Sequence, residues 1–349
     1  MIKILIDAPA WVGDAVMAQC LFIALKQQSP QVEIHVLASA GLRPVFERMP
    51  EIDRIWIAPE QHGRLALRAR FRLAKQLRHE RFDKAIVLRN SLKSALIPFL
   101  ARIPVRIGWL GEKRYGLLNQ WRVLNPDRYP RMIDRFVALG LGPTASLPAK
   151  LSYPQLLSTG AQIQQSLSSL GLTPPNRPLL ILCPGAEYGP AKRWPAAYFA
   201  QVANRKIKQG WSVWILGSAK EAGLAAAIAA THPNECLDLT GKTRLDQAID
   251  LLSLADCVVS NDSGLMHMAA ARQRPLVVIY GSSSSDFTPP LSQHVVAVSR
   301  ELSCSPCFQR QCPLKHMDCL TQLLPETVLA AIDRVYKESS HAKSLHAVL

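Results

Sequence analysis

The sequence predicts an α/β fold of two domains, each built on a doubly wound parallel sheet. Short apolar runs alternate with helix-like segments along most of the chain, the pattern of parallel strands joined by helices. The chain has 349 residues, 48% hydrophobic and 19% charged, which suits two folded domains of ordinary size. Gly, Pro and Ser are concentrated between residues 140 and 178. We therefore expect domains at 1–160 and 170–325.

The first half begins with a strand, a tight turn and a helix. The expected strands of this half are Ile2–Ile6, Glu33–Ala38, Ile52–Ile57, Lys84–Leu88 and Val105–Gly108. Helical spacing of apolar residues predicts a helix from Asp14 to Gln28 and a short one at Leu42–Met49. Gly13 and Asp14 stand at the first strand–helix turn, and ligands of open α/β sheets collect at such strand ends. Capping of the helix is the alternative role for Asp14.

The stretch Arg64–Arg81 predicts a strongly basic helix with two faces. The expected apolar stripe consists of Leu67, Phe71, Ala74 and Leu77. Cations at steps of three and four residues line another face: Arg64, Arg68, Arg72 and Lys75. Seven cations in these 18 residues are offset only by Glu80. We expect this face to bind an anion, although a solvated helix face is the usual meaning of such a charge run.

The positive charge lies mainly in the first half of the chain. Residues 1–150 hold 24 Lys and Arg against 12 Asp and Glu, a balance of +12, whereas residues 151–349 hold 17 against 14. Nucleic acid, an anionic membrane face or a phosphorylated acceptor would each match the basic half. No apolar run reaches the ~18–20 residues of a membrane-spanning helix. The chain starts directly in a strand without a secretory signal, so we expect a cytoplasmic protein with reduced thiols.

The loop Pro184–Pro195 is the strongest candidate site of the second half. It joins the buried apolar run Pro178–Cys183 to the helical stretch Ala196–Gln209. Lys192 and Arg193 stand just before that helix, whose N-terminus offers unpaired N–H groups and partial positive charge. The loop therefore predicts a phosphate or diphosphate site, with an ordinary solvated loop as the alternative.

Small and polar residues also follow the later strands, as they do around nucleotide sites. These strands are Ser212–Leu216, Cys236–Leu239, Cys257–Ser260 and Pro275–Tyr280. The fragment Gly241-Lys242-Thr243 is not read as a P-loop, because the first glycine of that motif is missing. A last helix is expected at Pro325–Lys337.

Three motifs stand out along the chain: Gly13-Asp14, the loop PGAEYGPAKRWP of residues 184–195 and NDSGLMHMAAA of residues 261–271. Together they resemble the heptosyltransferases of lipopolysaccharide synthesis, glycosyltransferase family 9. The similarity extends along nearly the whole chain. It implies a GT-B architecture, with two Rossmann-like domains facing a cleft. The N-terminal domain would bind the acceptor and the C-terminal domain the nucleotide sugar, while residues 325–349 would carry a helix that crosses back to the N-terminal domain.

The resemblance also implies an inverting transfer of L-glycero-D-manno-heptose from ADP-heptose. The acceptor would be the first heptose of the lipopolysaccharide inner core, on heptosyl-Kdo2-lipid A. This acceptor is anionic and lipid-anchored, so we expect peripheral contact with the cytoplasmic face of the inner membrane. A family member acting on a different core acceptor is one alternative. A basic nucleic-acid-binding protein is another, although it leaves the second half unexplained.

Residue by residue, the resemblance assigns Asp14 as the general base on the acceptor hydroxyl and Lys192 as the binder of the donor diphosphate. Glu221 would accept the ribose hydroxyls. The ADP-heptose pocket would be lined by Gly13, Asp262, Ser263, Gly264 and His267. The acceptor anions would meet Arg64, Arg68, Arg72 and Lys75. A buried, satisfied core histidine is the alternative for His267.

Four cysteines near the C-terminus have the spacing C-x2-C-x4-C-x6-C: Cys304, Cys307, Cys312 and Cys319. Four thiolates can bind a structural zinc, but a second C-x2-C pair is usual in zinc ribbons. Unligated thiols are the other reading. We assign no metal ligand and expect no cofactor.

Overall fold

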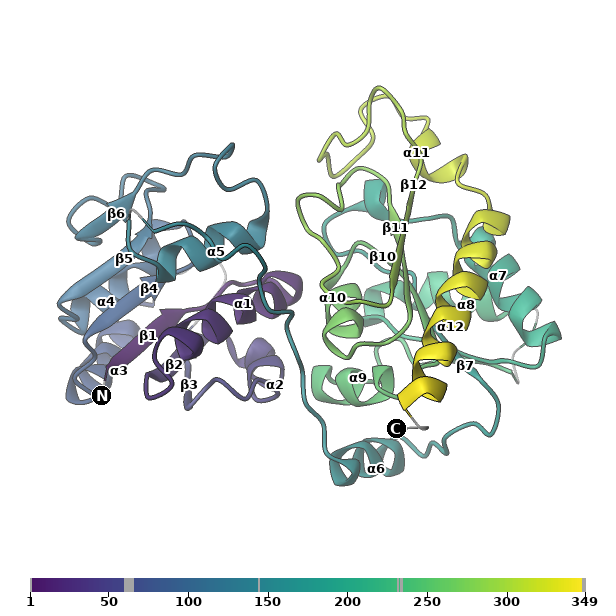
Figure 1. Ribbon diagram of the computed structural model, residues 1–349, viewed down its shortest axis with the longest axis horizontal. Coiled ribbons are helices and arrows are strands. Elements are labelled where there is room, and N and C mark those ends of the chain that lie inside the picture. Colours follow the sequence, from purple (N-terminus) through teal and green to yellow (C-terminus); the bar gives the residue numbers. More distant parts are fainter. Residues whose placement is uncertain (1, 60–65, 144, 231, 233–234, 347–349) are drawn as a thin grey trace. The chain divides into compact units, whose positions relative to one another are not determined.

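The structure is a computed structural model that describes residues 2–59, 66–143, 145–230, 232 and 235–346 (Figure 1). The chain divides into two compact units, Met1–Pro154 and Gln155–Leu349, and each is described by itself. The division falls a few residues before the expected boundary at 160.

The first unit is built on a parallel sheet whose strand order is β3-β2-β1-β4-β5-β6. The strands are β1 (Lys3–Asp7), β2 (Glu33–Ala38), β3 (Arg54–Ile57), β4 (Lys84–Val87), β5 (Val105–Trp109) and β6 (Gln120–Arg122). The helices are α1 (Val12–Gln28), α2 (Arg43–Phe46), α3 (Leu67–His79), α4 (Leu96–Leu100) and α5 (Met132–Gly140), with 3₁₀ turns η1 (Ala40–Leu42) and η2 (Leu92–Ser94). Sequence patterns did not predict β6 or α5.

Helix α3 differs from the expected two-faced helix. Its buried residues are Arg70, Leu73, Ala74 and Leu77, whereas Leu67 and Phe71 are exposed. The predicted apolar stripe is therefore wrong in its first half. Arg70, counted among the surface cations, is buried and donates to the carbonyl of Lys93 at 3.1 Å. Satisfaction of a backbone acceptor makes this buried guanidinium tolerable.

The second unit repeats the topology, with strand order β12-β11-β10-β7-β8-β9 in a parallel sheet. The strands are β7 (Leu179–Cys183), β8 (Ser212–Ile215), β9 (Cys236–Asp238), β10 (Cys257–Asn261), β11 (Leu276–Tyr280) and β12 (Val295–Ser299). The helices are α6 (Gly160–Ser169), α7 (Ala196–Lys208), α8 (Ala222–Ala229), α9 (Leu245–Leu252), α10 (Gly264–Ala271), α11 (Asp318–Thr321) and α12 (Pro325–His346), with 3₁₀ turns η3 (Pro190–Lys192) and η4 (Ala219–Glu221). Both units thus have the strand order of a doubly wound nucleotide-binding fold, which confirms the predicted fold class.

The long helix α12 packs on the sheet of the second unit (Figure 1). Val328, Ile332 and Val335 are buried in the same core as Val259 of β10 and Val277 of β11. Its first half is therefore part of the second unit. Across the described ranges, every helix is too short or too polar to span a bilayer.

Candidate active site

The centre of the second unit's site is an ion pair between Lys192 and Asp262. Lys192 comes from the loop after β7, and Asp262 directly follows β10. These two strands are neighbours at the point where the strand order reverses, and ligands of doubly wound folds bind at that point. The side chains are 15% and 4% exposed, so the pair is largely shielded from water. The structure brings together two residues that lie 70 positions apart in the chain.

The loop Pro184–Pro195 is held in place by Asn261, which sequence reasoning did not single out. The Asn261 amide donates to the carbonyl of Pro184 at 2.7 Å, and its oxygen accepts from the Trp194 N–H at 3.1 Å. One buried side chain thus fixes both ends of the loop. Its position at the end of a buried strand was the available signal.

Arg193, the other predicted cation of this loop, is hydrogen-bonded to the loop's own backbone. Its guanidinium donates to the carbonyl of Ala186 at 3.1 and 3.2 Å, so it braces the loop. Lys192 lies 5.0 Å from the centre of the Tyr188 ring, and the guanidinium of Arg310 lies 5.2 Å from the same centre. Lys192 is therefore the cation of this loop that pairs with Asp262, and Arg310 lies nearby on the Tyr188 ring.

The N-terminus of α10 adds hydrogen-bond donors beside Asp262. Ser263 caps the helix, and its hydroxyl accepts from the Met266 N–H at 3.4 Å. His267 follows one turn later and is 4% exposed. Burial lowers the pKa of His267 to about 4, against the opposing effect of Asp262 and with a further lowering by Lys192. His267 is therefore neutral near pH 7 and offers hydrogen bonds rather than positive charge.

Glu221 is buried at the end of η4 and closes the turn after β8. Its Oε2 accepts from the N–H and the hydroxyl of Ser218, at 2.7 and 2.6 Å. A Cβ on Gly185 would lie 2.9 Å from the Cδ and Cγ of Glu221, so Gly185 gives this carboxylate its space. Glu221 is thus packed against the first residues of the Lys192 loop.

In the first unit, Gly13 and Asp14 lie in the first turn of α1. The N-cap residue of this helix is Trp11, whose side chain makes no cap hydrogen bond, so Asp14 does not occupy the N-cap position. A carboxylate in the first turn still interacts favourably with the helix dipole. Asp14 is neither fully buried nor fully exposed.

A second ion pair joins β1 to the residue that follows β4, at the point where the strand order of the first sheet reverses. Asp7 ends β1, and Arg89 follows β4, its neighbour in the sheet. The guanidinium binds the carboxylate of Asp7 through two nitrogens, at 2.6 and 2.9 Å, and Asp7 is 1% exposed. The buried Arg114 donates to the Arg89 carbonyl at 2.6 Å and so holds the backbone of Arg89 in place. Sequence reasoning missed this network, although Asp7 and Arg89 directly follow apolar strands.

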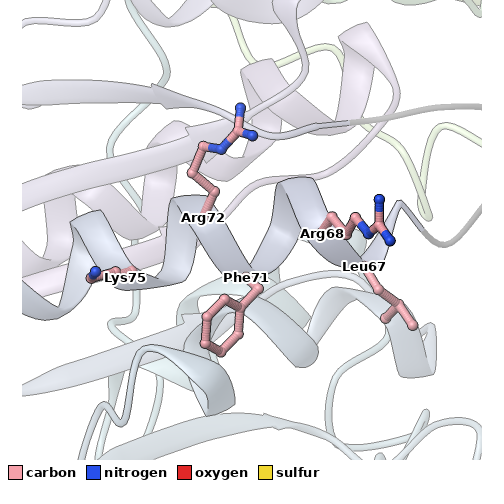
Figure 2. A pocket seen from close by; sticks show the side chains of 5 residues that line it. All are labelled: Leu67, Arg68, Phe71, Arg72 and Lys75. Carbon is pink, nitrogen blue, oxygen red and sulfur yellow. The ribbon is translucent and has the colours of Figure 1, made fainter.

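The basic face of α3 lines a surface pocket with Leu67, Arg68, Phe71, Arg72 and Lys75 (Figure 2). Figure 2 shows Leu67 and Phe71 on one side of the helix and Arg72 on the other. The lining contains cations and apolar side chains but no carboxylate. Arg64, the fourth predicted cation of this face, lies outside the described residues.

The four C-terminal cysteines lie between β12 and the start of α12 as free thiols. Within the ranges that the structure describes, no cluster of three or more His, Cys, Asp or Glu is arranged to hold a metal ion. The segment carrying them contacts the Lys192 loop instead: the Arg310 carbonyl accepts from the Ala191 N–H at 3.1 Å, and the Phe308 carbonyl accepts from the Tyr188 hydroxyl at 2.7 Å.

Comparison with known proteins gives one consistent answer. A family model described as glycosyltransferase family 9 (heptosyltransferase) matches residues 70–318. Lipopolysaccharide heptosyltransferase 2 of Salmonella typhimurium is 48% identical over 299 residues, covering 83% of this chain and 86% of that protein. Lipooligosaccharide heptosyltransferase 2 of Haemophilus ducreyi is 44% identical over 312 residues, covering 85% of this chain and 88% of that protein.

Among solved structures, that of E. coli ADP-heptose lps heptosyltransferase II matches with a TM-score of 0.87 at 38% identity. The match covers 97% of this chain and all of that chain. The fold of the more distant E. coli heptosyltransferase WaaC with ADP, at 18% identity, is also shared, with a TM-score of 0.71. The chain therefore belongs to glycosyltransferase family 9, the heptosyltransferases, and has their GT-B fold.

Proposed function

We propose that this protein transfers L-glycero-D-manno-heptose from ADP-heptose to the first heptose of the lipopolysaccharide inner core. The observation that carries the proposal is the Lys192–Asp262 pair at the strand-order reversal of the second sheet, in a chain 48% identical to a lipopolysaccharide heptosyltransferase 2. A largely buried cation beside a helix N-terminus is the chemistry that a nucleoside diphosphate requires.

The donor side of the reaction belongs to the second unit in this proposal. Lys192 exchanges part of its contact with Asp262 for the diphosphate and neutralises the charge that grows on the departing ADP. The N–H groups of Ser263 and Gly264 bind phosphate oxygens at the start of α10. Neutral His267 and Asp262 line the pocket. The carboxylate of Glu221 accepts hydrogen bonds from the ribose hydroxyls.

The acceptor side belongs to the first unit. Asp14 accepts the proton of the attacking hydroxyl as the new C–O bond forms at the anomeric carbon, while the bond to ADP breaks on the opposite face. Inversion of the anomeric centre follows from this single displacement. Arg68, Arg72 and Lys75 attract the phosphates and Kdo carboxylates of the acceptor, together with Arg64.

A defined acceptor panel tests the proposal. Purified protein is incubated with ADP-heptose and with cores that end at Kdo2, at the first heptose or at the second heptose. Transfer only to the core that ends at the first heptose is the expected result. Transfer to Kdo2 alone would identify a first heptosyltransferase, and transfer only beyond the second heptose would identify a third. Tight binding to duplex DNA without transfer of heptose to any acceptor would favour the nucleic-acid alternative.

We also infer that the protein works in the cytoplasm and associates peripherally with the inner membrane. The acceptor is lipid-anchored, and the first half carries a balance of +12. Clustered Lys and Arg gain about 1 kcal/mol each near an anionic surface, an attraction that salt weakens. Co-sedimentation with anionic vesicles should therefore decrease as salt rises.

A further inference from the structure

Four large apolar side chains are exposed on one helical layer of the first unit. They are Leu67 (56% exposed) and Phe71 (57%) on α3, Leu92 (41%) on η2 and Phe99 (42%) on α4. Single exposed apolar residues are common, but four within 33 positions of one layer form a patch that needs a reason. Exposure of apolar side chains to water is unfavourable, so we expect a partner that covers them.

Helices α3 and α4 present these side chains on the same side of the first sheet. Leu73 and Leu77 of α3 and Ile97 of α4 are buried in one core cluster with Leu5 of β1 and Ala85 of β4. The two helices are tied together at their ends, because the Arg78 guanidinium donates to the Leu100 carbonyl at 2.8 Å. Their outward faces therefore form one continuous surface, which we call the α3–α4 face.

The charge of the α3–α4 face is mainly positive. Its exposed cations are Arg68, Arg72, Lys75, Lys93 and Arg102. Neither residues 67–79 nor residues 91–102 contain an Asp or a Glu. Two carboxylates lie at its borders: Glu112 accepts from the Leu92 N–H at 2.6 Å, and Glu80 is paired with Lys3 at 3.2 Å and Arg54 at 2.9 Å. An occupant of this face must therefore be both anionic and apolar.

We propose that the α3–α4 face docks on an anionic lipid bilayer, with Leu67 and Phe71 entering the acyl boundary and the cations binding lipid phosphates. An amphipathic helix with Leu and Phe on one side and Arg and Lys around them binds membranes in the plane of the interface. Long basic side chains reach the headgroups while their methylenes stay on apolar surface. A nucleic acid would use the cations but would leave Leu67, Leu92 and Phe99 in water. The inference names the membrane surface of the proposed function and rests on it for the lipid-anchored acceptor.

The test uses the full chain and vesicles of phosphatidylglycerol and phosphatidylethanolamine, with phosphatidylcholine vesicles as the neutral comparison. The variant Leu67→Gln/Phe71→Gln removes the apolar part while keeping helix-forming residues. Val123→Gln/Leu324→Gln is the matched control, because those side chains are 71% and 51% exposed elsewhere. Because the bilayer would bury both apolar side chains, their loss should weaken partition into anionic vesicles roughly tenfold or more and leave that of the control unchanged.

A second pair of variants separates charge from apolar insertion. Arg72→Gln/Lys75→Gln should flatten the decrease of vesicle binding with salt, whereas Leu67→Gln/Phe71→Gln should weaken binding at every salt concentration and keep the slope. Arg205→Gln/Lys208→Gln, two exposed cations of α7, is the charge control and should behave as the parent chain.

Turnover on a water-soluble core acceptor without acyl chains distinguishes the two proposals. The Leu67→Gln/Phe71→Gln variant should lose far more turnover on vesicle-borne acceptor than on this soluble acceptor. Unchanged vesicle binding of that variant, no binding by the parent chain, or stronger binding to duplex DNA than to vesicles would each overturn the docking surface. Vesicle binding that depends on Leu67 and Phe71 in a protein without heptose transfer would support the surface and refute only the enzymatic function.

Discussion

At the residue scale, Asp14 tests the enzymatic proposal most directly. The residue lies in the first turn of α1, and the N-cap position of that helix is Trp11. Asp14→Asn keeps the shape of the side chain but cannot accept a proton. We expect a loss of turnover of roughly 10²–10⁴, the range for general acid–base catalysis, with little change in ADP-heptose affinity. Steady-state kinetics and calorimetric titration measure the two quantities.

The control for Asp14 is Asp127→Asn, which changes an exposed carboxylate of the same unit. It should leave both turnover and melting temperature unchanged. Near-normal turnover of Asp14→Asn would exclude this residue as the base. A lower melting temperature without a kinetic defect would make its role structural.

Variants of the Lys192–Asp262 pair distinguish a role in ADP binding from a role in the stability of the fold. Lys192→Met leaves a buried carboxylate without its cation, which should cost on the order of 2 kcal/mol and weaken ADP binding. In the double variant Lys192→Met/Asp262→Asn the stranded charge is gone, so stability should recover while ADP binding does not. Thermal melts with and without ADP measure both effects. Recovery of ADP binding in the double variant would show that Lys192 does not contact the diphosphate.

His267 predicts a pH dependence of stability. Its pKa in the folded protein is about 4, below the ordinary value of 6.5, so the unfolded chain binds the proton first as pH falls. The folded state therefore loses stability from about pH 6.5 down to about pH 4, by about 3 kcal/mol in total from this group. Urea unfolding of the protein and of His267→Gln should show a shallower decrease in the variant. Equal slopes would mean that His267 is already charged when folded.

At the element scale, the Lys192 loop depends on the segment that carries the cysteines. A Cβ on Gly189 would lie 2.4 Å from the Arg310 carbonyl oxygen, so Gly189→Ala forces these two segments apart. We expect a destabilisation of about 1–3 kcal/mol and a raised KM for ADP-heptose. Gly223→Ala on α8 is the matched control, since a Cβ there meets nothing within 4 Å. Equal kinetics of the two variants would show that Arg310 and the loop move independently.

Elements with clear periodicity could be predicted, and side-chain partners could not. The buried strands β7 and β10 follow from local patterns, which also put Lys192 and Asp262 after strand ends, whereas α1 begins at Val12, two residues before the predicted start at Asp14. Helix α3 was expected, but its buried face was rotated in the prediction because Arg70 is satisfied by a distant carbonyl. The Asp7–Arg89 pair depends on β1 and β4 being neighbours, and no local pattern states which strands pair.

At the scale of the whole molecule, each unit has its own sheet and core, so the second unit should fold and bind ADP alone. A fragment of residues 155–349 contains every residue proposed for the donor except Gly13. We expect cooperative unfolding and ADP affinity within a few-fold of the full chain. No heptose transfer is expected, because Asp14 is absent.

Shorter fragments test the role of α12. The sequence predicts that this helix crosses back to the first domain, whereas the structure packs its first half in the core of the second unit. Val328, Ile332 and Val335 are each at most 1% exposed. Loss of a large buried side chain such as Ile lowers the free energy of unfolding by about 2–5 kcal/mol. A fragment of residues 155–324 should therefore fail to fold, whereas residues 155–339 should fold as well as 155–349. Circular dichroism melts compare the three fragments. If 155–339 were far less stable than 155–349, the last turns of α12 would also be needed by the second unit. If 155–324 folded and bound ADP, the helix would be free to serve the first unit, as a crossing helix requires.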